Sequence, residues 1–150
     1  MNDGTQLQAL KRLGLLAGSL RGLARLPQWD RPETGSINAR ARAYLDVNCG
    51  HCHNPKGPAD TSGLWLTWDQ PANPNLGLYK RPTAAGRGSA GLEFAIRPGA
   101  PDQSYLVARM ESLEPGIAMP ELGRATVHRE GVALIRDWIK QIPDHPRTEN

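Results

Sequence analysis

Residues 46–57, DVNCGHCHNPKG, constrain this chain more than any other segment, because they hold both cysteines and two of the four histidines. Cys49 and Cys52 are three positions apart, and His53 follows directly. Cysteines at this spacing are typical of half a zinc site, of a redox dithiol or of a haem attachment site. The rest of the sequence has to distinguish between these kinds of site.

The first two kinds of site lack partners in this chain. A structural zinc site needs four ligands, usually with a second Cys or His pair at short spacing. Only His128 and His145 remain downstream, far apart in the sequence. A thioredoxin-like dithiol belongs beside a βαβ unit, and no such pattern follows the cysteines. Two unrelated cysteines with a histidine next to them remain as a coincidence of composition.

Cys49-Gly-His-Cys52-His53 is also the Cys-x-x-Cys-His pattern of c-type haem attachment. One helical turn between the thiols lets each bond one vinyl group, and the adjacent histidine then meets the iron. The motif therefore predicts one covalent haem (iron) per chain, attached through Cys49 and Cys52 and ligated by His53.

A second axial ligand is needed on the far side of the iron, and four side chains are candidates. Met110 lies in the apolar stripe of a predicted helix, where a packing role is expected. Met119 lies in a loop before proline, which favours extended backbone. The sequence therefore predicts Met119 as the ligand rather than His128 or His145. His/Met ligation raises the reduction potential and suits electron transfer.

Hydrophobic periodicity predicts a mainly helical chain. Leucines recur at helical spacing in residues 5–25, and a connector rich in proline follows. Ser36 is a predicted N-cap for a helix that leads into Cys49. Further helices are expected from Asp102 or Ser104 to about Leu113 and over 131–142, with short strands at 64–68 and 94–99.

Composition fits one soluble domain: 150 residues, of which 22% are charged and 39% hydrophobic. The formal net charge is +3, and no run of Lys and Arg has the density of a nucleic-acid site. The most apolar stretch, residues 13–20, is too short to cross a bilayer. We expect no nucleic-acid partner and no membrane span in this chain. The oligomeric state is not indicated.

The order of these features resembles a class I cytochrome c domain, with a helix before the motif, a distal methionine loop and a C-terminal helix crossing the first. The match covers residues 36–142. More narrowly, RARAYLDVNCGHCHNPKG, PGAPDQSYLVARM, AMPELGR and EGVALIRDWI resemble haem c domains of poorly characterised bacterial cytochromes, including the planctomycete type. In those domains the methionine of MPELGR is the distal ligand.

The resemblance implies a mainly α, cytochrome c-like fold around one haem, with a long loop or short β-hairpin insert at about 64–100. Residues 1–35 are expected to form an N-terminal helical extension and linker packed on a monohaem domain of residues 36–150. The implied activity is one-electron transfer to a redox partner protein, as an electron carrier rather than an enzyme. The implied location is the periplasm or another exported site, although no signal peptide is visible.

Three further side chains are predicted to bind the haem, because indole N–H and guanidinium groups pair with carboxylates such as propionates. These residues are Trp65, Arg97 and Arg124. Trp138 is instead predicted to pack between helices. Other interpretations stay open: a haem enzyme or gas sensor with a labile sixth ligand, the electron-entry module of a larger oxidoreductase, and a metal-binding module without haem.

Overall fold

The computed structural model describes residues 5–20, 25–83 and 85–144. Over these residues the regular structure is helical, and no strand is formed, so the predicted mainly α class is confirmed. No helix in this part is long and apolar enough to cross a membrane. The α-helices are α1 (Thr5–Arg12), α2 (Ile37–Leu45), α3 (Tyr105–Glu111) and α4 (Arg129–Gln141), with short 3-10 helices at Pro32–Thr34, Asp60–Ser62, Pro74–Leu76, Gly86–Ser89 and Pro101–Gln103.

Helix α2 begins where the sequence predicts. The Ser36 hydroxyl accepts a hydrogen bond from the Ala39 backbone N–H at 3.2 Å, which satisfies one of the free donors of the first turn. At its other end α2 continues without a break into a π-helical turn, Asp46–Gly50. Wide turns of this kind occur frequently at functional sites. Here the turn carries Cys49.

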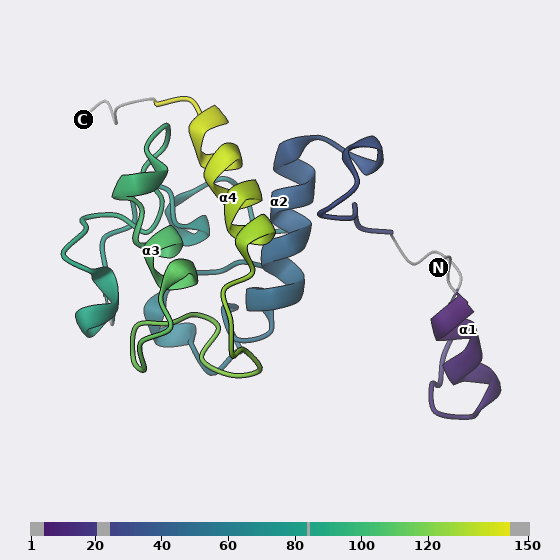
Figure 1. Cartoon of the computed structure of the whole chain (residues 1–150). Coiled ribbons are helices and arrows are strands. Elements are labelled where there is room, and N and C mark those ends of the chain that lie inside the picture. Colours follow the sequence, from purple (N-terminus) through teal and green to yellow (C-terminus); the bar gives the residue numbers. More distant parts are fainter. Residues whose placement is uncertain (1–4, 21–24, 84, 145–150) are drawn as a thin grey trace.

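Helix α4 packs against α2, and the two lie side by side in Figure 1. The crossing is close at Gly131, where a Cβ atom would lie 2.3 Å from the Tyr44 hydroxyl oxygen. Trp138 is buried and donates its indole N–H to the Asn38 side chain of α2 at 2.9 Å, so its predicted packing role is confirmed. Of the predicted apolar stripe, Val132, Ile135, Trp138 and Ile139 are buried, Ile142 is partly buried, and Leu134 is buried as well.

Helix α3 packs against α4 and adds its apolar side chains to the core. It is shorter than the predicted helix, because the chain before Tyr105 forms the 3-10 helix Pro101–Gln103 and the chain after Glu111 becomes extended at Ser112. Leu106, Val107 and Met110 point into the core.

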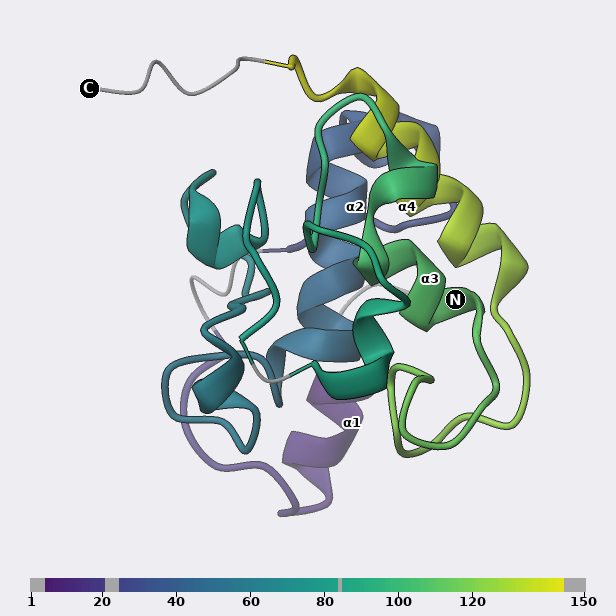
Figure 2. The ribbon, with the colours of Figure 1, turned by 90° about the vertical axis from the view of Figure 1, so that its left-hand side faces the viewer.

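Residues 64–100 form no strand among the described positions, and the expected hairpin is not seen there. Two isolated parallel bridges occur among the described residues, Leu78 with Ile96 and Phe94 with Ser104. The alternation at 64–68 is real, since Leu64 and Leu66 are buried, yet no neighbouring strand pairs with it. Frequent glycine and proline residues turn this segment every few positions. In Figure 2 its first part (teal) lies to the left of α2, and α4 lies to the right.

The N-terminal helix α1 is shorter than its leucine pattern. Beyond Arg12 the chain turns at Gly14, whose φ is +72°, and Leu13 and Leu15 remain 71% and 72% exposed. Within the described residues α1 packs against no other helix (Figure 1). The linker does reach the domain, since Trp29 packs against the core. Packing of the whole segment 1–35 stays a prediction, as residues 1–4 and 21–24 lie outside the description.

Candidate cofactor-binding site

The Cys-x-x-Cys-His segment is a compact helical turn at the end of α2. The N–H groups of Cys52 and His53 both donate to the Cys49 carbonyl, at 3.1 and 2.8 Å. The Asn54 side chain donates to the Gly50 carbonyl at 2.8 Å, which fastens the next residues to the same turn. Both cysteines are free thiols. The turn therefore presents two thiols and an imidazole from five successive residues.

The chain after His53 folds back against this turn. A Cβ atom at Gly57 would lie only 2.2 Å from the Cys52 carbonyl oxygen, so only glycine fits that position without a shift of backbone. The Leu66 N–H then donates to the His53 carbonyl at 2.8 Å. The backbone of Leu66, near the start of residues 64–100, thus helps to hold the Cys-x-x-Cys-His turn in place.

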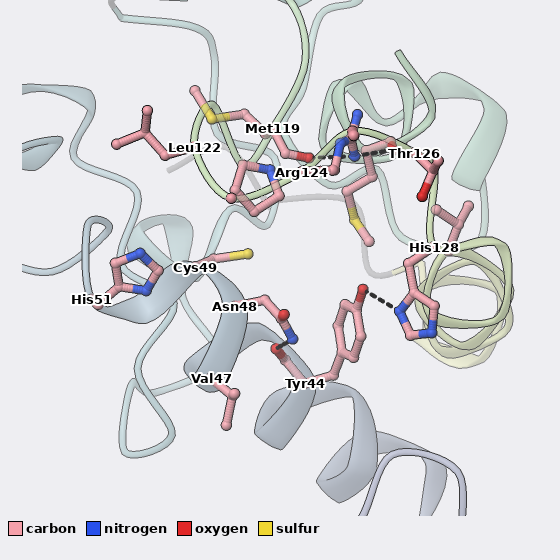
Figure 3. Close-up of a pocket in the computed structure, with 15 residues that line it drawn as sticks. Tyr44, Val47, Asn48, Cys49, His51, Met119, Leu122, Arg124, Thr126 and His128 are labelled. Atoms are coloured by element: carbon pink, nitrogen blue, oxygen red, sulfur yellow. Dashed lines mark hydrogen bonds between the residues drawn. The ribbon is translucent and has the colours of Figure 1, made fainter. Parts of the chain in front are cut away.

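A cavity of about 420 Å³ lies beside the turn, within the range of small-molecule and cofactor sites. Figure 3 shows Tyr44 and Cys49 on one side of the cavity and Met119 and Arg124 on the other, with the Cys49 sulfur directed into the space between them. The side chains that line the cavity are Tyr44, Val47, Asn48, Cys49, His51, Met110, Met119, Pro120, Leu122, Arg124, Ala125, Thr126, His128 and Val132, together with Gly123.

Cys52 and His53 belong to the same turn but do not line the cavity. The Nδ1 atom of His53 lies 3.4 Å from the Ser62 hydroxyl oxygen. That hydroxyl donates to the Ala59 carbonyl at 2.6 Å, so its oxygen faces His53 as an acceptor. This arrangement favours the tautomer with the proton on Nδ1 and the lone pair on Nε2. Nε2 is then the atom suited to bind a metal.

The electrostatic surroundings of His53 favour the neutral ring. Burial lowers the pKa of His53, and the positive charge of Arg109 acts in the same direction, whereas a hydrogen bond with the backbone of Leu64 and the charge of Glu121 oppose them. Glu121 is two residues beyond Met119, so His53 and the Met119 loop are within electrostatic range. A neutral imidazole is the form that ligates metals.

Cys49 is a neutral thiol in this site. Burial raises its pKa to about 12, and the neighbouring Cys52 adds to the shift. Reactive redox cysteines have the opposite property, a lowered pKa in an electropositive environment. The thiol of Cys49 therefore stays protonated at neutral pH.

Met119 is fixed through both of its backbone groups. Its N–H donates to the Arg109 carbonyl at 3.0 Å, and its carbonyl accepts from Arg124 Nη1 at 2.8 Å. The Met119–Pro120 peptide bond is cis. Met110, which the sequence assigns to packing, is buried and also lines the cavity. Met110 and Met119 therefore both line the cavity into which the Cys49 sulfur is directed.

Of the other predicted haem-binding residues, only Arg124 lines the cavity. Its donors bind backbone carbonyls. Trp65 lies next to Leu66 in the chain, and its buried indole Nε1 has no hydrogen-bond partner among the described residues. Arg97 is exposed, lies outside the cavity lining and donates to the Gln103 side chain at 2.5 Å.

His128, considered above as an axial ligand, is part of a small aromatic cluster. Its Nδ1 atom is hydrogen-bonded to the Tyr44 hydroxyl at 2.9 Å, and the Trp29 ring meets it edge-on at 4.6 Å between centroids. Burial raises the pKa of Tyr44. Sequence periodicity predicts Tyr44 only as a core residue, and nothing in the pattern joins it to a histidine 84 positions away. His145 lies outside the described residues.

Over the described residues, no three His, Cys, Asp or Glu side chains gather in a group that could hold a metal ion. A comparison of the chain with protein-family models, curated proteins and solved structures found no match.

Proposed function

We propose that this chain is a c-type cytochrome domain, which carries single electrons through one covalently bound haem. The observation that supports the proposal most directly is the cavity beside the Cys-x-x-Cys-His turn. It receives the Cys49 sulfur from the end of α2 and is lined across from it by the backbone-anchored Met119. A haem placed there would meet the Cys49 thiol on one side and Met119 on the other, with Cys52 and His53 on the same helical turn as Cys49.

The two thiols have the chemistry that attachment requires. Each thiol would hold the haem by adding across one of its vinyl groups, which would form a C–S bond and place the thiol hydrogen on the neighbouring carbon. The addition releases no leaving group and needs no oxidant. The Cys49 thiol keeps its proton because burial raises its pKa. The hydrogen bonds of the helical turn fix the position of Cys52 relative to Cys49.

His53 and Met119 are the residues that would hold the haem iron. The contact of Nδ1 with Ser62 leaves Nε2 as the ligating atom, as partners of the outer ring nitrogen commonly do in metal sites. When bound, haem supplies one-electron exchange between ferric and ferrous iron. With a His and a Met both bound to its iron, the haem would suit electron transfer rather than substrate binding at iron.

The remaining residues at the site also fit a haem. Met110 and Val132 give the cavity an apolar wall, which suits the porphyrin face. Trp65 does not line the cavity, but its buried indole N–H has no hydrogen-bond partner among the described residues, and a donor of this kind suits an added acceptor. A haem propionate is such an acceptor. Trp65 is therefore retained as a proposed haem contact, and the support for Arg97 is weaker.

The test of the proposal is the haem content of protein matured in a bacterial periplasm. We expect a c-type haemochrome spectrum that stays with the polypeptide after acid–acetone extraction. Replacing Cys49 and Cys52 with alanine should remove the covalent haem. His53→Ala should abolish the native low-spin spectrum, whereas His51→Ala, a change at the neighbouring exposed histidine, should preserve it. Protein that matures without covalent haem would rule the proposal out.

Carbon monoxide distinguishes an electron carrier from a haem enzyme or gas sensor. If Met119 occupies the sixth position, the reduced protein binds carbon monoxide slowly or not at all. Met119→Ala should open that position and allow prompt binding. Prompt binding by the unaltered protein would favour the enzyme or sensor instead. The proposed location is outside the cytosol, and the proposed partner is another redox protein.

A further inference from the structure

The loop that carries Met119 is joined to the end of α3 by one main-chain hydrogen bond and one hydrogen bond from a side chain. Helix α3 ends at Glu111, and the last carbonyls of a helix lack partners within it. One of them, the Arg109 carbonyl, accepts the Met119 N–H at 3.0 Å. In return, the Arg109 Nε atom donates to the Ile117 carbonyl at 3.0 Å. These two contacts fix the approach of the chain to Met119.

Arg124 fixes the chain on the other side of Met119. Its Nη1 atom donates to the carbonyls of Met110, at 2.6 Å, and Met119, at 2.8 Å. Its Nη2 atom donates to the Ser112 carbonyl. One guanidinium therefore joins the C-terminal end of α3 to the carbonyl of the proposed ligand, over sequence separations of 14, 12 and 5 residues.

This use of Arg124 follows from the chemistry of the two groups. The C-terminal end of a helix carries partial negative charge and exposes carbonyl acceptors, which favours a cationic donor there. A guanidinium presents several N–H groups in one rigid plane, so it can serve carbonyls from two segments at once. A lysine ammonium keeps the charge but lacks that planar geometry.

We propose that Arg124 is the positioning residue for Met119: it holds the loop so that the thioether stays at the iron. This inference rests on the proposed function. It replaces the expectation that Arg124 pairs with a propionate, because both of its terminal nitrogens are occupied by backbone carbonyls. Arg124 acts on the haem through the main chain of Met119.

The experiment compares holoprotein variants Arg124→Ala and Arg124→Lys with Arg81→Ala. Arg81 is a matched control, since it is an exposed arginine paired with Glu93 at 2.5 Å. Covalent haem is measured first, so that a failure of haem attachment in the unaltered protein is recognised as a failure of the proposed function. The methionine-to-ferric-iron charge-transfer band, the reduction potential and carbon monoxide binding then report the Met119 bond.

We expect Arg124→Ala to lose the charge-transfer band, lower the potential and bind carbon monoxide on the order of tenfold faster or more, as the loss of a charge-assisted hydrogen bond implies. Arg124→Lys should give an intermediate result, and Arg81→Ala should match the unaltered protein. Amide hydrogen exchange at the Met119 N–H supplies a readout that does not depend on the haem, and it should accelerate in Arg124→Ala alone. If Arg124→Ala fails to mature, Arg124→Lys carries the test. A variant at Arg124 with covalent haem and an unchanged band, potential and Met119 exchange would overturn the proposal.

Discussion

His53 makes the stability of the haem-free chain depend on pH. Burial lowers the pKa of His53 in the folded state, so the unfolded chain takes up a proton at a higher pH than the folded chain does. The contribution of His53 to stability is therefore constant above the ordinary histidine pKa and is lost as the pH falls through that value toward the folded one. Urea unfolding between about pH 8 and about pH 5 should show this loss.

The control for this prediction lies two residues away. His53→Gln should flatten the pH dependence, whereas His51→Gln, which removes only the smallest of the contributions to the lowered pKa of His53, should leave most of it in place. A slope of the same size in His53→Gln would assign the effect to another group.

Individual site residues were predictable from sequence where their chemistry is local. The spacing of Cys49, Cys52 and His53 fixes one helical turn, and the structure forms that turn. The contacts of Arg124, by contrast, were not predictable from the sequence. Arg124 donates to backbone carbonyls, which every residue carries. A pattern of side chains in the sequence therefore cannot predict which carbonyls it binds. The pairing of Tyr44 with His128 likewise depends on how two helices cross.

At the scale of elements, the crossing of α2 and α4 depends on the absence of a side chain at Gly131. A Cβ atom there would lie 2.3 Å from the Tyr44 hydroxyl oxygen and 2.6 Å from His128 Nδ1. Gly131→Ala should therefore destabilise the protein by about 1–3 kcal/mol, the usual cost of overpacking, although alanine is the better helix former. Chemical denaturation measures the change.

The opposite substitution on the exposed face of the same helix isolates helix propensity. Ala133→Gly should cost about 1 kcal/mol, with no effect on the crossing. A Gly131→Ala variant that gains stability by a similar amount would show that the two helices have room to separate.

Sequence periodicity located the helices better than it located the irregular chain. The stripe of α4 predicts its buried face correctly, because a helix of thirteen residues repeats its pattern several times. The alternation at 64–68 predicts a strand, but a strand needs a partner, and the following prolines and glycines provide turns instead. The π-helical turn Asp46–Gly50 has no pattern of its own and was not predictable.

On the scale of the whole molecule, the linker and α1 should contribute unequally to stability. Removing residues 1–24 should change the free energy of unfolding by no more than about 0.5 kcal/mol, since α1 contacts no other helix among the described residues. Removing residues 1–35 also deletes Trp29, which packs edge-on against His128 and accepts a hydrogen bond from Arg40 at 2.8 Å. We expect that deletion to cost about 2 kcal/mol or more, because loss of a buried aromatic costs about 3–5 kcal/mol and Trp29 is half-buried.

Thermal and urea unfolding of the two shortened chains measure the difference, and full-length Trp29→Ala separates the side chain from the rest of the linker. Equal stabilities of the two shortened chains would place the beginning of the folded unit at residue 36, as the sequence predicts. A large loss on removing residues 1–24 would mean that α1 stabilises the domain.

The attachment of the Met119 loop has a consequence for how this protein can change. The loop is held by the Arg109 carbonyl on one side and by the Arg124 guanidinium on the other, and both contacts use only the main chain of residue 119. The path of the backbone is therefore independent of the side chain it presents. A different metal-binding side chain at position 119, such as histidine, would be held by the same two backbone contacts. A single substitution could therefore change the ligand of the iron without changing the path of the loop.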